Sequence, residues 1–290
     1  MDLTNSLILI NPKSGSLGKQ IKPIDLRQKL TAHGLAPEIH IAKDGSAIAR
    51  FVQLVRKRRP SVVLVAGGDG TIGAVLKGLI DVPLRFGIIP MGSLNNLAGT
   101  IGLTGDLDQA IEVIKNGNTR RIDAARVGDE IMFEALGLGM FAEILNKTDW
   151  DTDKNVGQLV ARSAVQVVTQ QPILVNATID GKTRRFETIW LAVANTQKIG
   201  ALTLDPASRP DDGTLELLYC HPLSALELPA YAVKFLQGDH LEEEKFERVQ
   251  GKRISLSFPH DTVVHIDDQI YHRSRLEVQV LPGALELFAP

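Results

Sequence analysis

The sequence has almost no cysteine, no excess of basic residues and no long apolar run. Cys220 is the single cysteine in 290 residues, so no disulfide can form within the chain, and a reducing, cytoplasmic setting is expected. Lysine and arginine number 32 against 34 acidic residues, a balance that argues against a nucleic-acid partner. No stretch approaches the roughly 18 apolar residues of a spanning helix, and residues 1–5 lack the features of a signal peptide. We therefore expect a cytoplasmic protein that contacts membranes only peripherally.

The first third of the chain alternates apolar strands with amphipathic helices. The hydrophobic content of 44% is sufficient for a sizeable core. Strands are predicted at residues 7–10, 39–42, 61–66 and 86–89, and helices at 19–32, 47–58, 72–79 and 107–115. This alternation predicts an α/β domain with a parallel, doubly wound sheet, whose ligands bind at the carboxyl ends of the strands.

After about residue 120 the pattern changes to short strands separated by turns. Strands are predicted at 121–127, 173–179, 185–194, 215–219, 254–258, 262–266 and 276–281, and helices only at 157–169 and 223–236. This pattern predicts a mostly antiparallel β-sandwich or barrel. We therefore expect two domains, 1–121 and 122–290. Whether the extreme C-terminus packs back on the first domain stays open.

A glycine-rich turn follows the predicted strand at 61–66. Gly67, Gly68 and Gly70 surround Asp69, and Thr71 leads into a helix. Glycine lets backbone N–H groups approach a ligand closely, and a helix start favours negative charge. The turn therefore predicts phosphate binding, with Asp69 within reach of a metal or a ribose hydroxyl. The alternative is a merely tight turn, for which one glycine would be enough.

Two further loops are expected at the same edge of the sheet. The first runs from Asn11 through Pro12, Lys13 and Ser14 to Gly15, and these residues can form an anion-binding nest with added side-chain donors. The second supplies a hydroxyl and two amides that could recognise a purine or a ribose; it contains Gly92, Ser93, Asn95 and Asn96. The alternative for the second loop is an ordinary turn with a helix cap at Ser93 or Asn95.

Taken in order along the chain, these landmarks resemble the diacylglycerol kinase family of lipid kinases. The resemblance spans nearly the whole chain. Its landmarks are Asn11–Gly15, Gly67–Thr71, Pro90–Asn96, Phe133–Gly139, Asn195 to Leu215 and Asp267–Gln269. It implies an N-terminal domain like that of NAD kinases and phosphofructokinases, a C-terminal β-sandwich, and an active site between them.

The resemblance also implies an activity, cofactors and residue roles. The family transfers the γ-phosphoryl group of ATP, with Mg²⁺, to a lipid hydroxyl at a membrane surface. Asp69 and Ser93 would lie near the nucleotide, which the three loops would bind, and Asp69 is also a candidate catalytic residue. Asp123 would help to hold water and Mg²⁺, with Asp212 as a second candidate metal ligand, and Asp267 would accept the proton of the substrate hydroxyl.

The sequence departs from the family pattern at several positions, and two rival functions stay open. Leu94 replaces a glycine, so a left-handed backbone there would be strained. Asn96 replaces an acidic residue, and Asp268-Gln269 replaces Gly-Glu. These changes support a regulator that binds nucleotide or lipid without transfer. The other rival is an NAD kinase-like enzyme, supported by the Asp69 motif alone.

Two further questions concern partners. The oligomeric state stays open, with a homodimer as one option. The basic run Arg56–Arg59 fits either contact with anionic lipid or, more simply, a solvated helix end.

Overall fold

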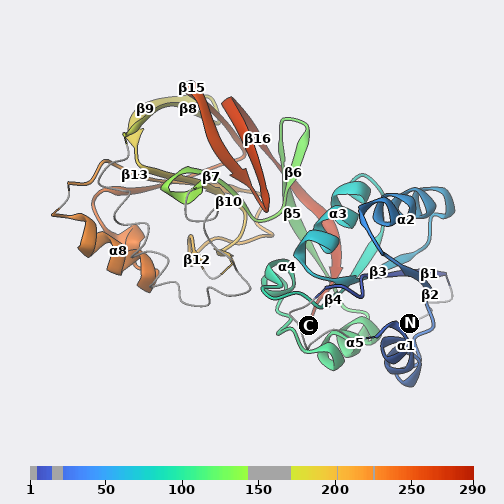
Figure 1. The fold of residues 1–290 in the computed structure, drawn as a ribbon. Helices are drawn as coiled ribbons and strands as arrows, with labels where there is room; N and C mark the ends of the chain where they lie inside the picture. Colours follow the sequence, from blue (N-terminus) through green and yellow to red (C-terminus); the bar gives the residue numbers. More distant parts are fainter. Residues whose placement is uncertain (1–4, 15–21, 143–170, 201, 225) are drawn as a thin grey trace. The chain divides into compact units, whose positions relative to one another are not determined.

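The structure, a computed structural model, describes residues 5–14, 22–142, 171–200, 202–224 and 226–290 (Figure 1). The chain forms two compact units. The first contains Met1–Ile122 and Gly283–Pro290, and the second contains Asp123–Pro282. The final residues therefore belong to the first unit. No helix in the described part of the chain is long and apolar enough to cross a membrane.

The first unit is built on a parallel sheet. Its strands are β1 (Ser6–Ile10), β2 (Glu38–Ile41), β3 (Val62–Gly67), β4 (Arg85–Pro90) and the end of β16 (Gln269–Phe288). They lie in the order β16-β4-β3-β1-β2, and Leu287 of β16 pairs with Phe86 of β4. Every residue of β1 and β3 is buried, which explains why both are continuous apolar runs.

Helices cover both faces of this sheet. They are α1 (Pro23–Ala32), α2 (Gly45–Arg58), α3 (Asp69–Leu79), α4 (Asn96–Thr100) and α5 (Leu107–Asn116). Figure 1 shows α2 and α3 on one side of the strands and α1 and α5 on the other. The prediction of a doubly wound sheet is confirmed. Helix α1 begins later than predicted because Pro23 disfavours the helical conformation at Lys22, whose ψ is 140°.

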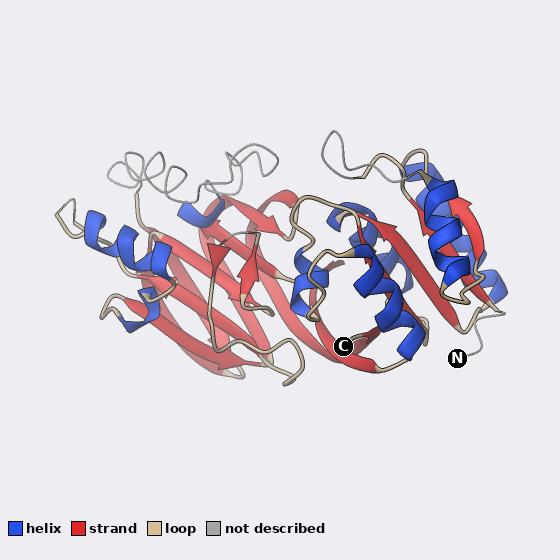
Figure 2. Cartoon of the chain, turned by 90° about the horizontal axis from the view of Figure 1, so that it is seen from below, coloured by secondary structure: helices blue, strands red, loops and turns tan. Residues whose placement is uncertain are grey.

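The second unit is dominated by strands, as Figure 2 shows. They are β6 (Glu130–Met132), β7 (Ala135–Gly139), β8 (Ile173–Ile179), β9 (Lys182–Thr188), β10 (Trp190–Ala194), β11 (Lys198–Ile199), β12 (Leu202–Thr203), β13 (Leu215–Cys220), β14 (Phe246–Gly251) and β15 (Arg253–Ile266). Strand β5 (Thr119–Val127) and strand β16 have residues in both units. Helices α8 (Leu228–Gln237) and η1 (His240–Glu242) also lie in this unit, and residues 140–142 are helical.

These strands pair antiparallel in the order β14-β13-β10-β7-β15-β16, and the β8–β9 hairpin joins at β15. Both faces of the central strand β10 are covered. Leu191 and Val193 belong to one hydrophobic cluster, whereas Trp190 and Ala192 belong to another. The prediction of an antiparallel second domain is confirmed, while the predicted helix at 157–169 lies outside the described residues.

Candidate active site

In the first unit, the loops that follow β1, β3 and β4 meet at one edge of the parallel sheet. Asn11 Nδ2 donates a hydrogen bond of 2.8 Å to Thr71 Oγ1. A Cβ added to Gly92 would lie only 2.8 Å from the Cα of Gly68, and one added to Gly68 would lie 3.9 Å from Ser14 Oγ. The structure thus brings together the three loops predicted from the sequence. Gly15 lies outside the described residues.

Close packing accounts for two of the three glycines around Asp69. A Cβ on Gly67 would lie 2.8 Å from Thr71 Cβ, and Gly68 packs against the backbone of Gly92. The glycine count on which the phosphate prediction rested therefore has a structural explanation at these two positions. Gly70, in contrast, is exposed. Lys13 and Ser93 are the exposed polar side chains on the other two loops.

Asp69 links the glycine-rich turn to the loop after β4. Burial raises the pKa of its carboxyl group, and hydrogen bonds from the backbone N–H groups of Asn95, Asn96 and Leu97 counter that rise. Its Oδ1 atom is buried and has no hydrogen-bond partner. An oxygen of this kind fits the hydroxyl of a ligand or the water shell of a cation, since a buried acceptor without a partner is costly.

Asn95 braces its own loop. Its Oδ1 accepts a 2.8 Å bond from Gly92 N, and its Nδ2 donates a 2.9 Å bond to Gly92 O. Asn95 is also the left-handed residue of the loop, with a φ of 54°. Leu94 therefore does not carry the strain that a left-handed backbone at position 94 would have caused. Recognition of a base or ribose by Asn95 stays a prediction.

In the second unit, Asp267 is anchored to the segment between β6 and β7. It occupies the turn between β15 and β16 with a φ of 51°. Its carboxylate accepts hydrogen bonds from the backbone N–H groups of Phe133, at 3.1 and 3.2 Å, and of Glu134, at 2.9 Å. Its own N–H donates to Ala135 O. These contacts fix the orientation of the carboxylate.

Asn195 joins Asp123 to residues 133–134, the segment that anchors Asp267. Its Nδ2 donates to the carbonyl oxygens of Asp123 at 3.1 Å and Phe133 at 2.8 Å, and its backbone N–H donates to Glu134 O. Its Oδ1 is buried without a partner. Asn195 is 1% exposed.

Asp123 is held by the loop before β13. Only 2% of Asp123 is exposed, and its Oδ2 accepts a 2.7 Å bond from Gly213 N. The neighbouring Asp212 is exposed, and its Oδ1 accepts bonds from the N–H and the hydroxyl of Thr214. The two predicted metal ligands are thus carried by segments that contact each other through Gly213. Within the described residues, no group of three or more His, Cys, Asp or Glu is arranged to hold a metal.

Sequence reasoning missed Glu134 as a site residue and used Asn195 only as a landmark. Glu134 is 8% exposed and adjoins the backbone contacts of Asp267. The signal for it was a single carboxylate inside the apolar run 131–136, because a buried charge is rarely retained without a role. Ion pairs within the first unit account for two residues of the basic run Arg56–Arg59, since Arg56 pairs with Asp81 and Arg58 with Glu38.

The comparisons with known proteins agree with this arrangement. A family model described as "Diacylglycerol kinase catalytic domain" matches residues 5–127, and one described as "YegS C-terminal NAD kinase beta sandwich-like domain" matches residues 139–289. The chain belongs to the diacylglycerol kinase family of lipid kinases. Members of this family are phosphotransferases with an alcohol acceptor, so the chain is assigned as an enzyme of this class.

Named relatives support this family membership. A protein named "Probable lipid kinase YegS" from Escherichia fergusonii is 26% identical over 299 residues, which is 100% of this chain and 97% of that protein. A protein named "Diacylglycerol kinase" from Bacillus subtilis is 24% identical over 268 residues, covering 90% of this chain and 88% of that protein. A crystal structure of a diacylglycerol kinase from Bacillus anthracis superposes with a TM-score of 0.76 at 20% identity, covering 99% of this chain and 97% of that one. That likeness confirms the fold.

Proposed function

We propose that this lipid kinase transfers the γ-phosphoryl group of ATP, with Mg²⁺, to the hydroxyl of a diacylglycerol-like lipid. The observation that carries the proposal is the polar cluster of the second unit, in which Asn195 bonds Asp123 and Phe133 while the adjacent Glu134 N–H bonds the Asp267 carboxylate. Phosphoryl transfer needs one carboxylate to accept the proton of the hydroxyl and further groups to neutralise charge. This cluster and the three loops of the first unit offer both kinds of group.

In the proposed reaction, the lipid hydroxyl oxygen bonds to the γ-phosphorus while the bond from that phosphorus to its bridging oxygen breaks. ADP leaves, and the hydroxyl proton goes to the carboxylate of Asp267. The bonds from Phe133 and Glu134 orient that carboxylate. Lys13 and Ser93 are the donors for the nucleotide phosphates.

The candidate site offers few carboxylate ligands, but enough for Mg²⁺. The ion is usually held by one or two carboxylates together with substrate phosphates and water, so two aspartates are sufficient. Asp123 and Asp212 are the proposed ligands, and the unpartnered Oδ1 of Asp69 suits a hydrated cation or a ribose hydroxyl. When bound, the ion would neutralise charge on the transferring phosphate. Because diacylglycerol-like lipids reside in membranes, we also propose peripheral membrane contact.

The test is transfer of label from γ-labelled ATP to a panel of lipid alcohols in mixed micelles, with NAD as a further acceptor. Labelled lipid that requires Mg²⁺, and disappears when the ion is chelated, is the expected result. Labelled NAD in place of lipid would instead make the chain an NAD kinase-like enzyme.

A third outcome is bound ATP without any transfer, which would favour the regulator that has lost activity. The variant Gln269→Glu restores the acidic residue of the family pattern at an exposed position. If that variant gains lipid transfer that the natural chain lacks, loss of activity through Gln269 is established.

A further inference from the structure

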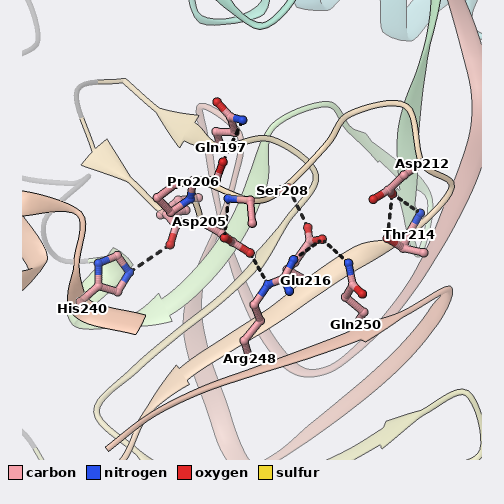
Figure 3. Close-up of polar contacts among 12 residues, drawn as sticks. Gln197, Asp205, Pro206, Ser208, Asp212, Thr214, Glu216, His240, Arg248 and Gln250 are labelled. Carbon is pink, nitrogen blue, oxygen red and sulfur yellow. Dashed lines mark hydrogen bonds and ion pairs between the residues drawn. The ribbon is translucent and has the colours of Figure 1, made fainter. Parts of the chain in front are cut away.

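An ionic network with two buried carboxylates lies in the second unit, among residues that were given no chemical role above. Arg248 of β14 lies between two carboxylates, and Figure 3 shows its ion pairs with Asp205 and Glu216. Its guanidinium is 3.3 Å from Glu216 Oε1. Asp205 is 1% exposed and Glu216 is fully buried. Two buried carboxylates are costly without a cation, so the structure around them depends on Arg248.

The network fixes one end of a loop, residues 204–214. Ser208 Oγ donates a 2.7 Å bond to Glu216 Oε2, and Gln197 Nε2 donates a 3.0 Å bond to Pro206 O. At the start of the loop, His240 Nε2 lies 3.0 Å from Leu204 O. The first half of the loop is therefore held by polar contacts, of which those of Ser208 and His240 are buried.

The other end of the same loop holds Asp123. The N–H of Asp123 donates a 2.6 Å bond to Pro210 O, and its carboxylate accepts a 2.7 Å bond from Gly213 N. Only one residue, Arg209, lies between Ser208, which is bonded to Glu216, and Pro210. A shift of the loop at Ser208 would therefore reach the two loop groups, Pro210 O and Gly213 N, that bond Asp123.

We infer that Arg248 is a positioning residue, which sets the place of the Asp123 carboxylate through Glu216, Asp205 and loop 204–214. Arginine suits this task because one guanidinium can bond two acceptors at once in fixed directions. The catalytic consequence of this inference rests on the proposed function. Its structural consequence, that the hydrogen bond from Gly213 N–H to Asp123 is kept formed, does not rest on it.

The experiment compares Arg248→Gln with Arg184→Gln by hydrogen exchange and by lipid phosphorylation. Arg184 of β9 is the matched control, because its ion pair is with Glu247 of β14, outside loop 204–214. In Arg248→Gln we expect exchange of the Gly213 amide to be about tenfold faster, and kcat to fall about 10- to 100-fold with the KM for ATP unchanged. Arg184→Gln is expected to leave both readouts unchanged. Arg248→Lys, which keeps the charge, is expected to restore part of kcat.

Unchanged Gly213 exchange in Arg248→Gln would overturn the inference, as would equal losses in both variants. If Arg248→Gln does not fold, Ser208→Ala removes one loop contact and leaves the ion pairs in place, and the same rise in exchange is expected. A chain without transfer activity would contradict the proposed function, while the exchange measurement would still decide the role of Arg248.

Discussion

At the scale of single residues, the glycines around Asp69 had been interpreted as giving access to phosphate. The structure adds a packing reason, because Gly68 and Gly92 lie backbone against backbone. Sequence alone could not separate the two roles, since the contact joins two loops whose distance depends on the whole sheet. Gly70 is exposed in the same turn, so phosphate binding there stays a prediction.

The packing role predicts opposite effects for two glycine substitutions. Gly92→Ala would place a Cβ 2.8 Å from the backbone of Gly68, so we expect the free energy of unfolding to fall by about 1–3 kcal/mol. Gly73→Ala meets nothing within 4 Å in the interior of α3 and should raise it by about 0.5–1 kcal/mol. Chemical unfolding of both variants checks this. Equal effects of the two substitutions would argue against the backbone contact.

His240 predicts a pH dependence of stability. It is fully buried, and burial lowers its pKa from the ordinary 6.5 to about 4. Between these values the unfolded chain binds more protons, so the stability that neutral His240 contributes is complete above pH 6.5 and is lost as pH falls toward 4. The loss amounts to about 3 kcal/mol. A plot of the free energy of unfolding against pH across this range should be less steep for His240→Phe than for the natural chain. Equal slopes would contradict the assignment.

At the scale of elements, β1 and β3 were predicted well from their continuous apolar runs, and β8 from apolar residues interrupted only by Asn176 and Thr178. Strand β7, Ala-Leu-Gly-Leu-Gly, was missed because its composition does not favour a strand. The run 185–194 was predicted as one strand but is divided between β9 and β10. The division lies where the Thr188 hydroxyl is 2.7 Å from Trp190 O and 2.8 Å from Cys220 O, a tertiary contact that periodicity does not reveal.

Thr188 should therefore contribute to the stability of this region. Thr188→Val keeps the shape of the side chain but removes the hydroxyl that the buried Trp190 and Cys220 carbonyl oxygens share and that accepts from Trp190 N–H, and we expect a loss of about 1–3 kcal/mol in the free energy of unfolding. Thr183→Val is the control, because Thr183 is exposed on β9 and its hydroxyl lies 3.4 Å from that of Thr178. Thermal unfolding compares the two. A loss no larger in Thr188→Val than in Thr183→Val would be inconsistent with this role.

At the scale of the whole molecule, the α/β and antiparallel halves follow from the two kinds of hydrophobic pattern. The place of the final residues does not follow from either pattern. After forming the second unit, the chain returns to the first, where Leu287 pairs with Phe86. The candidate site, too, could be predicted from the sequence only in part. Asp123 and Asp267 were identified by resemblance, whereas the link between them through Asn195 depends on contacts between residues 62 and 72 positions apart.

The central claim is that the lipid hydroxyl loses its proton to Asp267, and a matched pair of variants in one turn tests it most directly. Asp267→Asn and Asp268→Asn remove the same charge from adjacent residues, but Asp268 is exposed and lies one residue beyond the anchored carboxylate. With labelled ATP, Mg²⁺ and lipid acceptor, kcat should fall about 100- to 10,000-fold in Asp267→Asn and stay near the natural value in Asp268→Asn. Retained activity in a folded Asp267→Asn protein would contradict the account.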